Sequence, residues 1–159
     1  LTNIGHFNDL DKIKNWRKIL SNQYETTKPL NIDGRKWKTI THYYNSQKFI
    51  EDNKNFSDLF FLESMHYISK DVKMAIAAGS KSGKYKKNTI RHKKIQIDKK
   101  FSKNKKNILY KALLEKFKQD DLSKKVLLNT KDAVLYEFEK GKQPSIASDI
   151  MKIRELLRI

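Results

Sequence analysis

The sequence of 159 residues is long enough for one domain with a buried core. It holds 35 basic and 18 acidic residues, which gives a formal net charge of +17. Aromatic residues make up 11% of the chain, a share that argues against intrinsic disorder. The absence of cysteine excludes a disulfide framework, and no apolar run is long enough to cross a bilayer. We therefore expect an intracellular protein, cytoplasmic or nuclear.

The charge is concentrated in one segment. Residues 81–106 hold 12 Lys or Arg and a single acid, Asp98, so this basic segment carries +11 of the +17. It is predicted to be a long exposed connection with at most a short strand. A field of this strength attracts polyanions, nucleic acid first and an anionic membrane surface second. The alternative is compositional, because Lys and Asn accumulate in proteins from AT-rich genomes such as those of large DNA viruses.

The first half of the chain predicts short helices around one hairpin. Apolar residues recur every three to four positions over 9–20, which predicts a helix. Asp33-Gly34 predicts a tight turn between two short strands. Thr39 is expected to cap a helix over 40–49, which would line a central pocket.

The second half predicts further helices on both sides of the basic segment. A helix over 69–78 is expected to end at Gly79 as a left-handed residue. Ser102 and Ser145 are expected to cap two later helices. A strand-like run over 133–138 lies between these two helices.

These elements predict an α+β, mainly α-helical single domain over residues 1–159, with a minor hairpin or small sheet. The chain begins at Leu1 rather than Met, so a fragment of a longer protein is an open alternative. The four histidines show no ligand spacing, and the glycines form no phosphate-binding motif. Neither a metal nor a cofactor is expected.

Residues 31–49 carry a resemblance to a known family. They read Asn-Ile-Asp-Gly-Arg-Lys-Trp-Lys-Thr-Ile-Thr-His-Tyr-Tyr-Asn-Ser-Gln-Lys-Phe. This resembles the signature of the NADAR, or YbiA-like, family, in which an Asp-Gly turn precedes Glu-His-Tyr-Phe-Gln-Ala-Gln-Lys-Phe. Further collinear matches lie at 20–22, 111–117, 127–130, 135–137 and 151–157. The resemblance implies the fold of this family and its N-glycosidase activity, the cleavage of ribosyl–nitrogen bonds in riboflavin-pathway intermediates or the removal of ADP-ribose from modified guanine.

The groups that this chemistry implies are altered here. The family acid precedes the His-Tyr pair, and Thr41 stands at that position. A hydroxyl group has no useful basicity at neutral pH and cannot stabilise a positively charged sugar centre. The family Trp position is Phe101, and the Trp-Gly-Asp loop before the last helix has no equivalent. Glu137 keeps its family position and is the candidate substitute acid.

Three hypotheses follow for function. The leading one is a non-catalytic NADAR-like module that binds nucleic acid or scaffolds a larger nucleic-acid-containing assembly with protein partners, in a setting that includes a viral factory or virion. The alternative is a divergent N-glycosidase or ADP-ribosyl hydrolase with rearranged groups, and the third is a purely structural protein.

Two sets of candidate site residues accompany these hypotheses. A pocket for a nucleotide or an ADP-ribose-like ligand is expected to involve Asn22, Trp37, Thr41, His42, Tyr43, Tyr44, Gln47 and Lys48. The aromatic members of this set are equally expected as core or pocket-wall residues. The nucleic-acid contacts are expected at Lys84, Lys86, Lys87, Arg91, Lys93, Lys94, Lys99 and Lys100.

Overall fold

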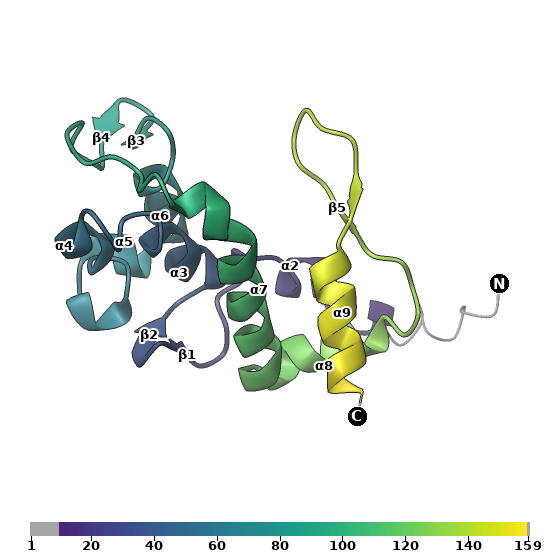
Figure 1. Cartoon of the computed structure of the whole chain (residues 1–159). Helices are drawn as coiled ribbons and strands as arrows, with labels where there is room; N and C mark the ends of the chain where they lie inside the picture. Colours follow the sequence, from purple (N-terminus) through teal and green to yellow (C-terminus); the bar gives the residue numbers. More distant parts are fainter. Residues whose placement is uncertain (1–9, 159) are drawn as a thin grey trace.

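The computed structural model describes residues 10–158 and confirms a mainly helical α+β fold (Figure 1). In chain order its elements are α2 (Trp16–Ile19), β1 (Leu30–Ile32), β2 (Arg35–Trp37), α3 (Ile40–Ser46), α4 (Lys54–Ser57), η1 (Leu62–Ser64), α5 (Tyr67–Lys70), α6 (Val72–Ala78), β3 (Lys84–Tyr85), β4 (Asn88–Thr89), α7 (Phe101–Gln119), α8 (Asp121–Asn129), β5 (Tyr136–Glu137), β6 (Ser145–Ile146) and α9 (Ser148–Leu157). The described strands form three separate antiparallel pairs, β1–β2, β3–β4 and β5–β6. Among these helices, none is both long and apolar enough to span a bilayer.

The core forms where the long helix α7 crosses the other elements. α7 contacts α3, α8, α9 and β1, and α3 also packs against α6. Tyr43 from α3, Phe117 from α7 and Ile153 from α9 are almost completely buried within one continuous apolar cluster. Helix α3 therefore lies at the centre of the molecule, with its polar side chains held between packed neighbours.

The predicted hairpin and the helix that follows it are confirmed. Asp33 and Gly34 have φ of 55° and 75°, the left-handed pair that a two-residue turn between twisted strands requires. β1 and β2 pair in register, with Leu30 opposite Trp37. The Thr39 side chain accepts a hydrogen bond from the N–H of His42 and so caps α3 as expected.

Several predicted boundaries are wrong. Position 9 of the helix predicted over 9–20 lies outside the described residues, and Asn15 interrupts the rest with a φ of 61°. α3 ends at Ser46 instead of residue 49. The helix predicted over 69–78 is split, because the Asp71 side chain accepts from Lys73 N–H and caps a new helix, α6.

Gly79 ends α6 as predicted, but its conformation differs, and two other predicted end residues have different roles. Gly79 is not left-handed, with a φ of −89°. It is required for space, because a Cβ at this position would lie 2.0 Å from Oδ1 of Asn45. Ser102 is the second residue of α7, and Ser145 belongs to β6 instead of capping α9.

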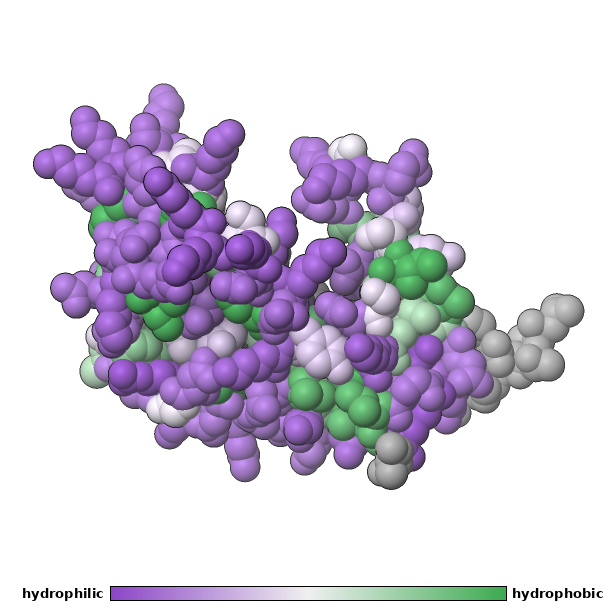
Figure 2. All heavy atoms as spheres, viewed as in Figure 1, coloured by the Kyte–Doolittle hydropathy of each residue, from purple (hydrophilic) through white to green (hydrophobic). Residues whose placement is uncertain are grey.

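Two projections rise from the same side of the molecule in Figure 1. One carries the β3–β4 hairpin within the basic segment, and the other is the β5–β6 hairpin before α9. The first half of α7 lies between them in this view. In the space-filling view, a hollow with a largely hydrophilic surface separates the two projections (Figure 2).

Candidate functional site

Helix α3 and its C-terminal turn hold most of the predicted pocket residues, but their side chains meet different neighbours. The Tyr43 hydroxyl donates to Oδ2 of Asp33 at 2.7 Å, and its ring meets the ring of Trp37 edge to face at 5.1 Å. The Trp37 Nε1 donates to the Ile32 carbonyl at 3.0 Å. Both rings are buried, so these two residues belong to the core beside the β1–β2 hairpin.

His42 is fully buried and faces α5 instead of a solvent-filled site. Its Nε2 lies 2.9 Å from the Ile68 carbonyl, which can only accept, so this nitrogen carries the proton. Its Nδ1 lies 2.8 Å from the Thr39 hydroxyl, which donates to it. Burial lowers the pKa of His42 to about 4. The imidazole is therefore neutral at pH 7 and has a structural role.

Thr41 is tied to the backbone of a neighbouring loop. Its N–H and its Oγ1 both donate to the carbonyl oxygen of Asn22, at 3.1 and 2.9 Å. Its own carbonyl accepts from Nδ2 of Asn45 at 2.9 Å. The residue is 8% exposed. The hydroxyl proton is thus committed to a carbonyl, and the structure brings Thr41 and Asn22 together as predicted neighbours.

Tyr44 and Lys48 form a cluster with Phe101 at the start of α7. The Tyr44 and Phe101 rings meet edge to face at 5.2 Å. The Lys48 ammonium lies 5.4 and 5.7 Å from the centroids of these two rings and donates to the Gly79 carbonyl at 2.8 Å. Gln47, the C-cap residue of α3, is half-buried. The Lys48 ammonium thus makes cation–π contacts with two rings of the fold itself.

The electrostatic setting of Lys48 is cationic. Burial, together with the nearby charges of Arg91 and Lys105, lowers its pKa to about 8. No described carboxylate forms an ion pair with it. Lys105, which belongs to the basic segment, therefore contributes to the electrostatics of this cluster. It was not among the predicted site residues, although the density of positive charge over residues 99–106 was a signal for it in the sequence.

Two carboxylates, Asp33 and Glu137, are candidates for a general acid, and no hydrogen bond among the described residues joins either of them to Thr41. Burial alone would raise the pKa of Asp33, but hydrogen bonds from Lys111 and Tyr43 outweigh it and hold that pKa below its ordinary value. Glu137 lies in β5, on the projection well apart from α3 in Figure 1. Partial burial and then the Asp149 charge raise the pKa of Glu137.

Comparison with known proteins identifies the family to which this fold belongs. A family model described as the NADAR domain matches residues 8–141. The chain belongs to the NADAR domain family. The NMR structure of the E. coli protein YbiA is similar to it with a TM-score of 0.62 and 23% identity, over 88% of this chain and 77% of that chain. At this identity the likeness shows the fold, and no curated protein matches the chain significantly.

In this NADAR domain the basic segment presents a set of exposed lysines. Six of them lie in or next to the β3–β4 hairpin: Lys81, Lys84, Lys86, Lys87, Lys93 and Lys94. The other five lie just before or within the first turns of α7: Lys99, Lys100, Lys103, Lys105 and Lys106. None of these eleven forms an ion pair with a described carboxylate. The set contains all the predicted nucleic-acid contacts except one, and it adds four lysines that the prediction did not name. We call this set the lysine surface.

Arg91 is the one predicted nucleic-acid contact outside the lysine surface, because its guanidinium donates to backbone carbonyls of the protein itself. Nη1 donates to the carbonyls of Ala78 and Ser80 at 2.6 and 2.7 Å, Nη2 to that of Lys81 at 3.2 Å, and Nε to that of Ile95 at 2.9 Å. The residue is 7% exposed. A guanidinium with these four acceptors is not presented to a phosphate, so Arg91 organises the segment that carries the lysine surface.

Asp98, the one acid of the basic segment, also faces inward. Its carboxylate accepts from the N–H groups of Glu51 and Asp52 at 2.9 and 3.2 Å, and its own N–H donates to the Lys48 carbonyl at 2.7 Å. This residue therefore joins the end of the basic segment to the turn after α3. Because the acid is buried, the exposed charge of the segment is entirely positive.

Proposed function

We propose that this NADAR domain binds nucleic acid without strong sequence preference, through the lysine surface, and does not hydrolyse N-glycosidic bonds. The observation that carries the proposal is the division of charge within residues 81–106. Eleven lysines face solvent without a described acidic partner, while the arginine and the carboxylate of the segment are turned inward. Such a surface is costly for a folded chain through self-repulsion, and phosphates relieve that repulsion on binding.

The absence of hydrolysis is proposed from the environment of Thr41. Its hydroxyl donates to the Asn22 carbonyl. Of the two candidate acids, Asp33 forms an ion pair with Lys111, and Glu137 lies on the β5–β6 projection. Glycoside cleavage requires a carboxylate beside the reacting carbon. The domain then acts as a binding part of a larger nucleic-acid-containing assembly, host or viral, with protein partners.

The salt dependence of binding tests the proposal. If about four to six phosphates are neutralised on a duplex, the logarithm of the binding constant falls with the logarithm of salt at a slope of roughly −4 to −5. Replacing Lys84, Lys86, Lys93 and Lys94 by Gln should flatten this slope by about 3 to 4. The measurement is fluorescence anisotropy of a labelled duplex at several salt concentrations.

A matched control removes the same charge elsewhere. It replaces Lys14, Lys28, Lys118 and Lys125, which are exposed and lie outside the basic segment, by Gln. This variant has the same net charge as the test variant, so a general loss of field would weaken both equally. Equal slopes for the two variants, or no binding of either a duplex or a single strand by the wild type at low salt, would refute the proposed function.

One observation favours the alternative, N-glycosidic hydrolysis by rearranged groups. The raised pKa of Glu137 is the direction that a general acid requires. The test measures release of base or ADP-ribose from ADP-ribosylated guanosine and from riboflavin-pathway intermediates. We expect no turnover by the wild type and none by Glu137→Gln. Turnover by the wild type that is lost in Glu137→Gln would establish the alternative.

A further inference from the structure

The β5–β6 projection exposes two aromatic rings. Tyr136 is 54% exposed and Phe138 is 81% exposed. Tyr136 lies in β5 and Phe138 follows directly after that strand, so both rings belong to the same arm of the hairpin. Ile146, which pairs with Tyr136 across the hairpin and shares its face, is 56% exposed. An exposed apolar face of this kind indicates a contact surface.

The projection is anchored firmly at its base. The Ala147 N–H donates to the Leu135 carbonyl at 2.8 Å, and Ala147 is buried. Beneath it, Nη1 of Arg154 donates to Oγ1 of Thr130 at 2.8 Å and to the Ala133 carbonyl at 2.9 Å. The two exposed rings therefore stand on a fixed support.

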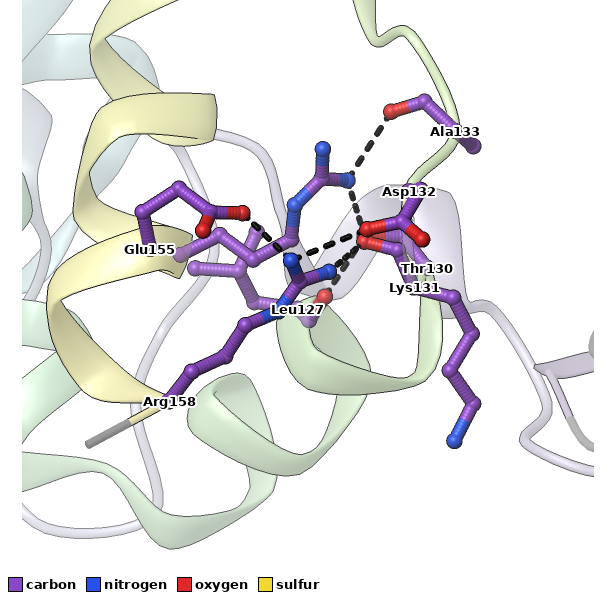
Figure 3. A network of polar contacts seen from close by, with 8 residues as sticks. Leu127, Thr130, Lys131, Asp132, Ala133, Glu155 and Arg158 are labelled. Carbon is purple, nitrogen blue, oxygen red and sulfur yellow. Dashed lines mark hydrogen bonds and ion pairs between the residues drawn. The ribbon is translucent and has the colours of Figure 1, made fainter.

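A second arginine ties the turn after α8 to α9 (Figure 3). Arg158 pairs with Asp132 at 2.9 Å and with Glu155, and it donates to the Lys131 carbonyl. These contacts hold the turn that leads into the projection. The charges of Arg158, Asp132 and Glu155 are therefore paired with one another, whereas the lysines of the lysine surface have no described acidic partner.

The charge of the projection differs from that of the lysine surface. Residues 136–146 contain Glu137, Glu139, Lys140 and Lys142, so their net charge is zero, and Lys142 pairs with Glu139 at 3.0 Å. The β3–β4 hairpin of the basic segment lies on the other side of the hollow, and the start of α7 lies between the two projections (Figures 1 and 2). The basic segment thus suits phosphates, and the exposed rings of the projection suit flat apolar groups. A second copy of the chain does not fit, because it would bring +17 against +17.

We infer that the β5–β6 projection supplies base-stacking rings, Tyr136 and Phe138, and that the nucleic acid bound by this domain is single-stranded. This inference rests on the proposed function. Unpaired bases expose their faces, and aromatic side chains beside a basic groove bind them whatever their sequence. In a duplex the base faces are stacked on one another and are closed to Tyr136 and Phe138.

The test compares two labelled probes, an oligothymidylate of about 15 nucleotides and a duplex of similar length. Replacing both Tyr136 and Phe138 by Leu keeps an apolar face but removes the rings. We expect affinity for the single strand to fall about 10-fold for each ring, and affinity for the duplex to change less than about 2-fold. The salt slope should stay the same, because no phosphate contact is lost. Tyr67→Leu, another exposed tyrosine, serves as the control and should change neither affinity.

Each outcome has a definite meaning. Retained single-strand affinity in the double Leu variant, with the four-lysine variant weakened on both probes, would overturn the stacking role and leave the proposed function in place. Equal losses on both probes would overturn the preference for single strands. A four-lysine variant that binds like its matched control would refute the proposed function itself. If sedimentation shows that the double Leu variant loses self-association but no affinity for the single strand, the projection is a protein contact and the inference is wrong.

Discussion

The two hairpins on either side of the hollow have strands of equal length, but one exposes charged side chains and the other exposes aromatic and apolar ones. β3–β4 and β5–β6 each consist of two residues per strand, too few to be stable alone. The first belongs to a segment that exposes eleven lysines, and the second exposes Tyr136, Phe138 and Ile146. Both depend on a buried arginine that donates to backbone carbonyls, Arg91 for the first and Arg154 for the second.

This comparison separates the support of a hairpin from its surface. Because an internal guanidinium satisfies the carbonyls of each loop, the outward residues contribute little to holding the hairpin together. The two arginines differ in how fully they are used. Arg91 donates from Nε, Nη1 and Nη2, whereas Nε of Arg154 is buried and has no hydrogen-bond partner among the described residues. The β3–β4 support should therefore be the stronger one.

The largest expected effect is from Arg91→Ala. It leaves the carbonyls of Ala78, Ser80, Lys81 and Ile95 without their donor, and it should lower stability by about 4 kcal/mol. Urea unfolding measures the loss, and hydrogen exchange should show faster exchange in the basic segment. The control is Arg35→Ala. Its exposed guanidinium lies over the Phe61 ring at 4.5 Å and should cost less than about 1 kcal/mol. Similar losses for both variants would contradict the supporting role of Arg91.

The next effect is a pH dependence that does not distinguish the two hairpins. The pKa of His42 is about 4 in the folded chain and about 6.5 when unfolded, so the unfolded chain binds the proton more tightly. Stability is fully present above pH 6.5 and falls by about 3 kcal/mol as the pH drops toward 4. Burial also lowers the pKa of Lys116, to about 7, but the stability change linked to Lys116 falls between pH 10.5 and pH 7. The two windows are separate.

Urea unfolding between pH 7 and pH 4 checks this expectation. His42→Gln should flatten the profile, and His92→Gln, which alters an exposed histidine, should leave it unchanged. Because α3 supports the whole core, amide exchange should increase in both hairpins together. Acid destabilisation confined to one hairpin would show that His42 does not govern it.

Local chemistry was sufficient to predict part of this fold from the sequence. The β1–β2 hairpin follows from Asp33-Gly34, because few pairs adopt two left-handed conformations at low cost. The cap of α3 follows from Thr39, whose side chain reaches the N–H of His42 three residues on. Family membership could also be predicted, because the motif over 31–49 is collinear with the family signature.

Features that depend on distant partners could not be predicted. Arg91 resembles the lysines around it in sequence, and only its acceptors at residues 78–81 and 95 show that it faces inward. Ser145 has the chemistry of a helix cap, but its pairing with Glu137 places it in β6. The predicted pocket set is divided for the same reason. Successive positions of α3 point to different sides, so Tyr43 joins Trp37 while Tyr44 joins Phe101.

A smaller effect is expected from Arg154→Ala, which loosens the base of β5–β6. It removes the donor to Thr130 and Ala133, but it also removes the unpartnered Nε, so we expect a loss of about 2 kcal/mol, half that of Arg91→Ala. Exchange at the Ala147 amide should become faster. The control Arg158→Ala removes partly exposed ion pairs and should cost less than about 1 kcal/mol. A loss greater than that of Arg91→Ala would reverse the order of the two supports.

The smallest effect concerns the outward residues of the two hairpins. Lys87→Gln and Phe138→Ser change exposed side chains without removing a backbone hydrogen bond, so each should alter stability by less than about 0.5 kcal/mol. Their effects on binding should nevertheless differ. Lys87→Gln reduces the magnitude of the salt slope by about 1 for a single lost phosphate contact, whereas Phe138→Ser weakens single-strand binding and leaves the slope unchanged. Thermal melts and anisotropy titrations of the two variants measure both quantities. Since Phe138 is 81% exposed, a substantial loss of stability in Phe138→Ser would mean that its ring is covered in solution, by a contact within or between chains.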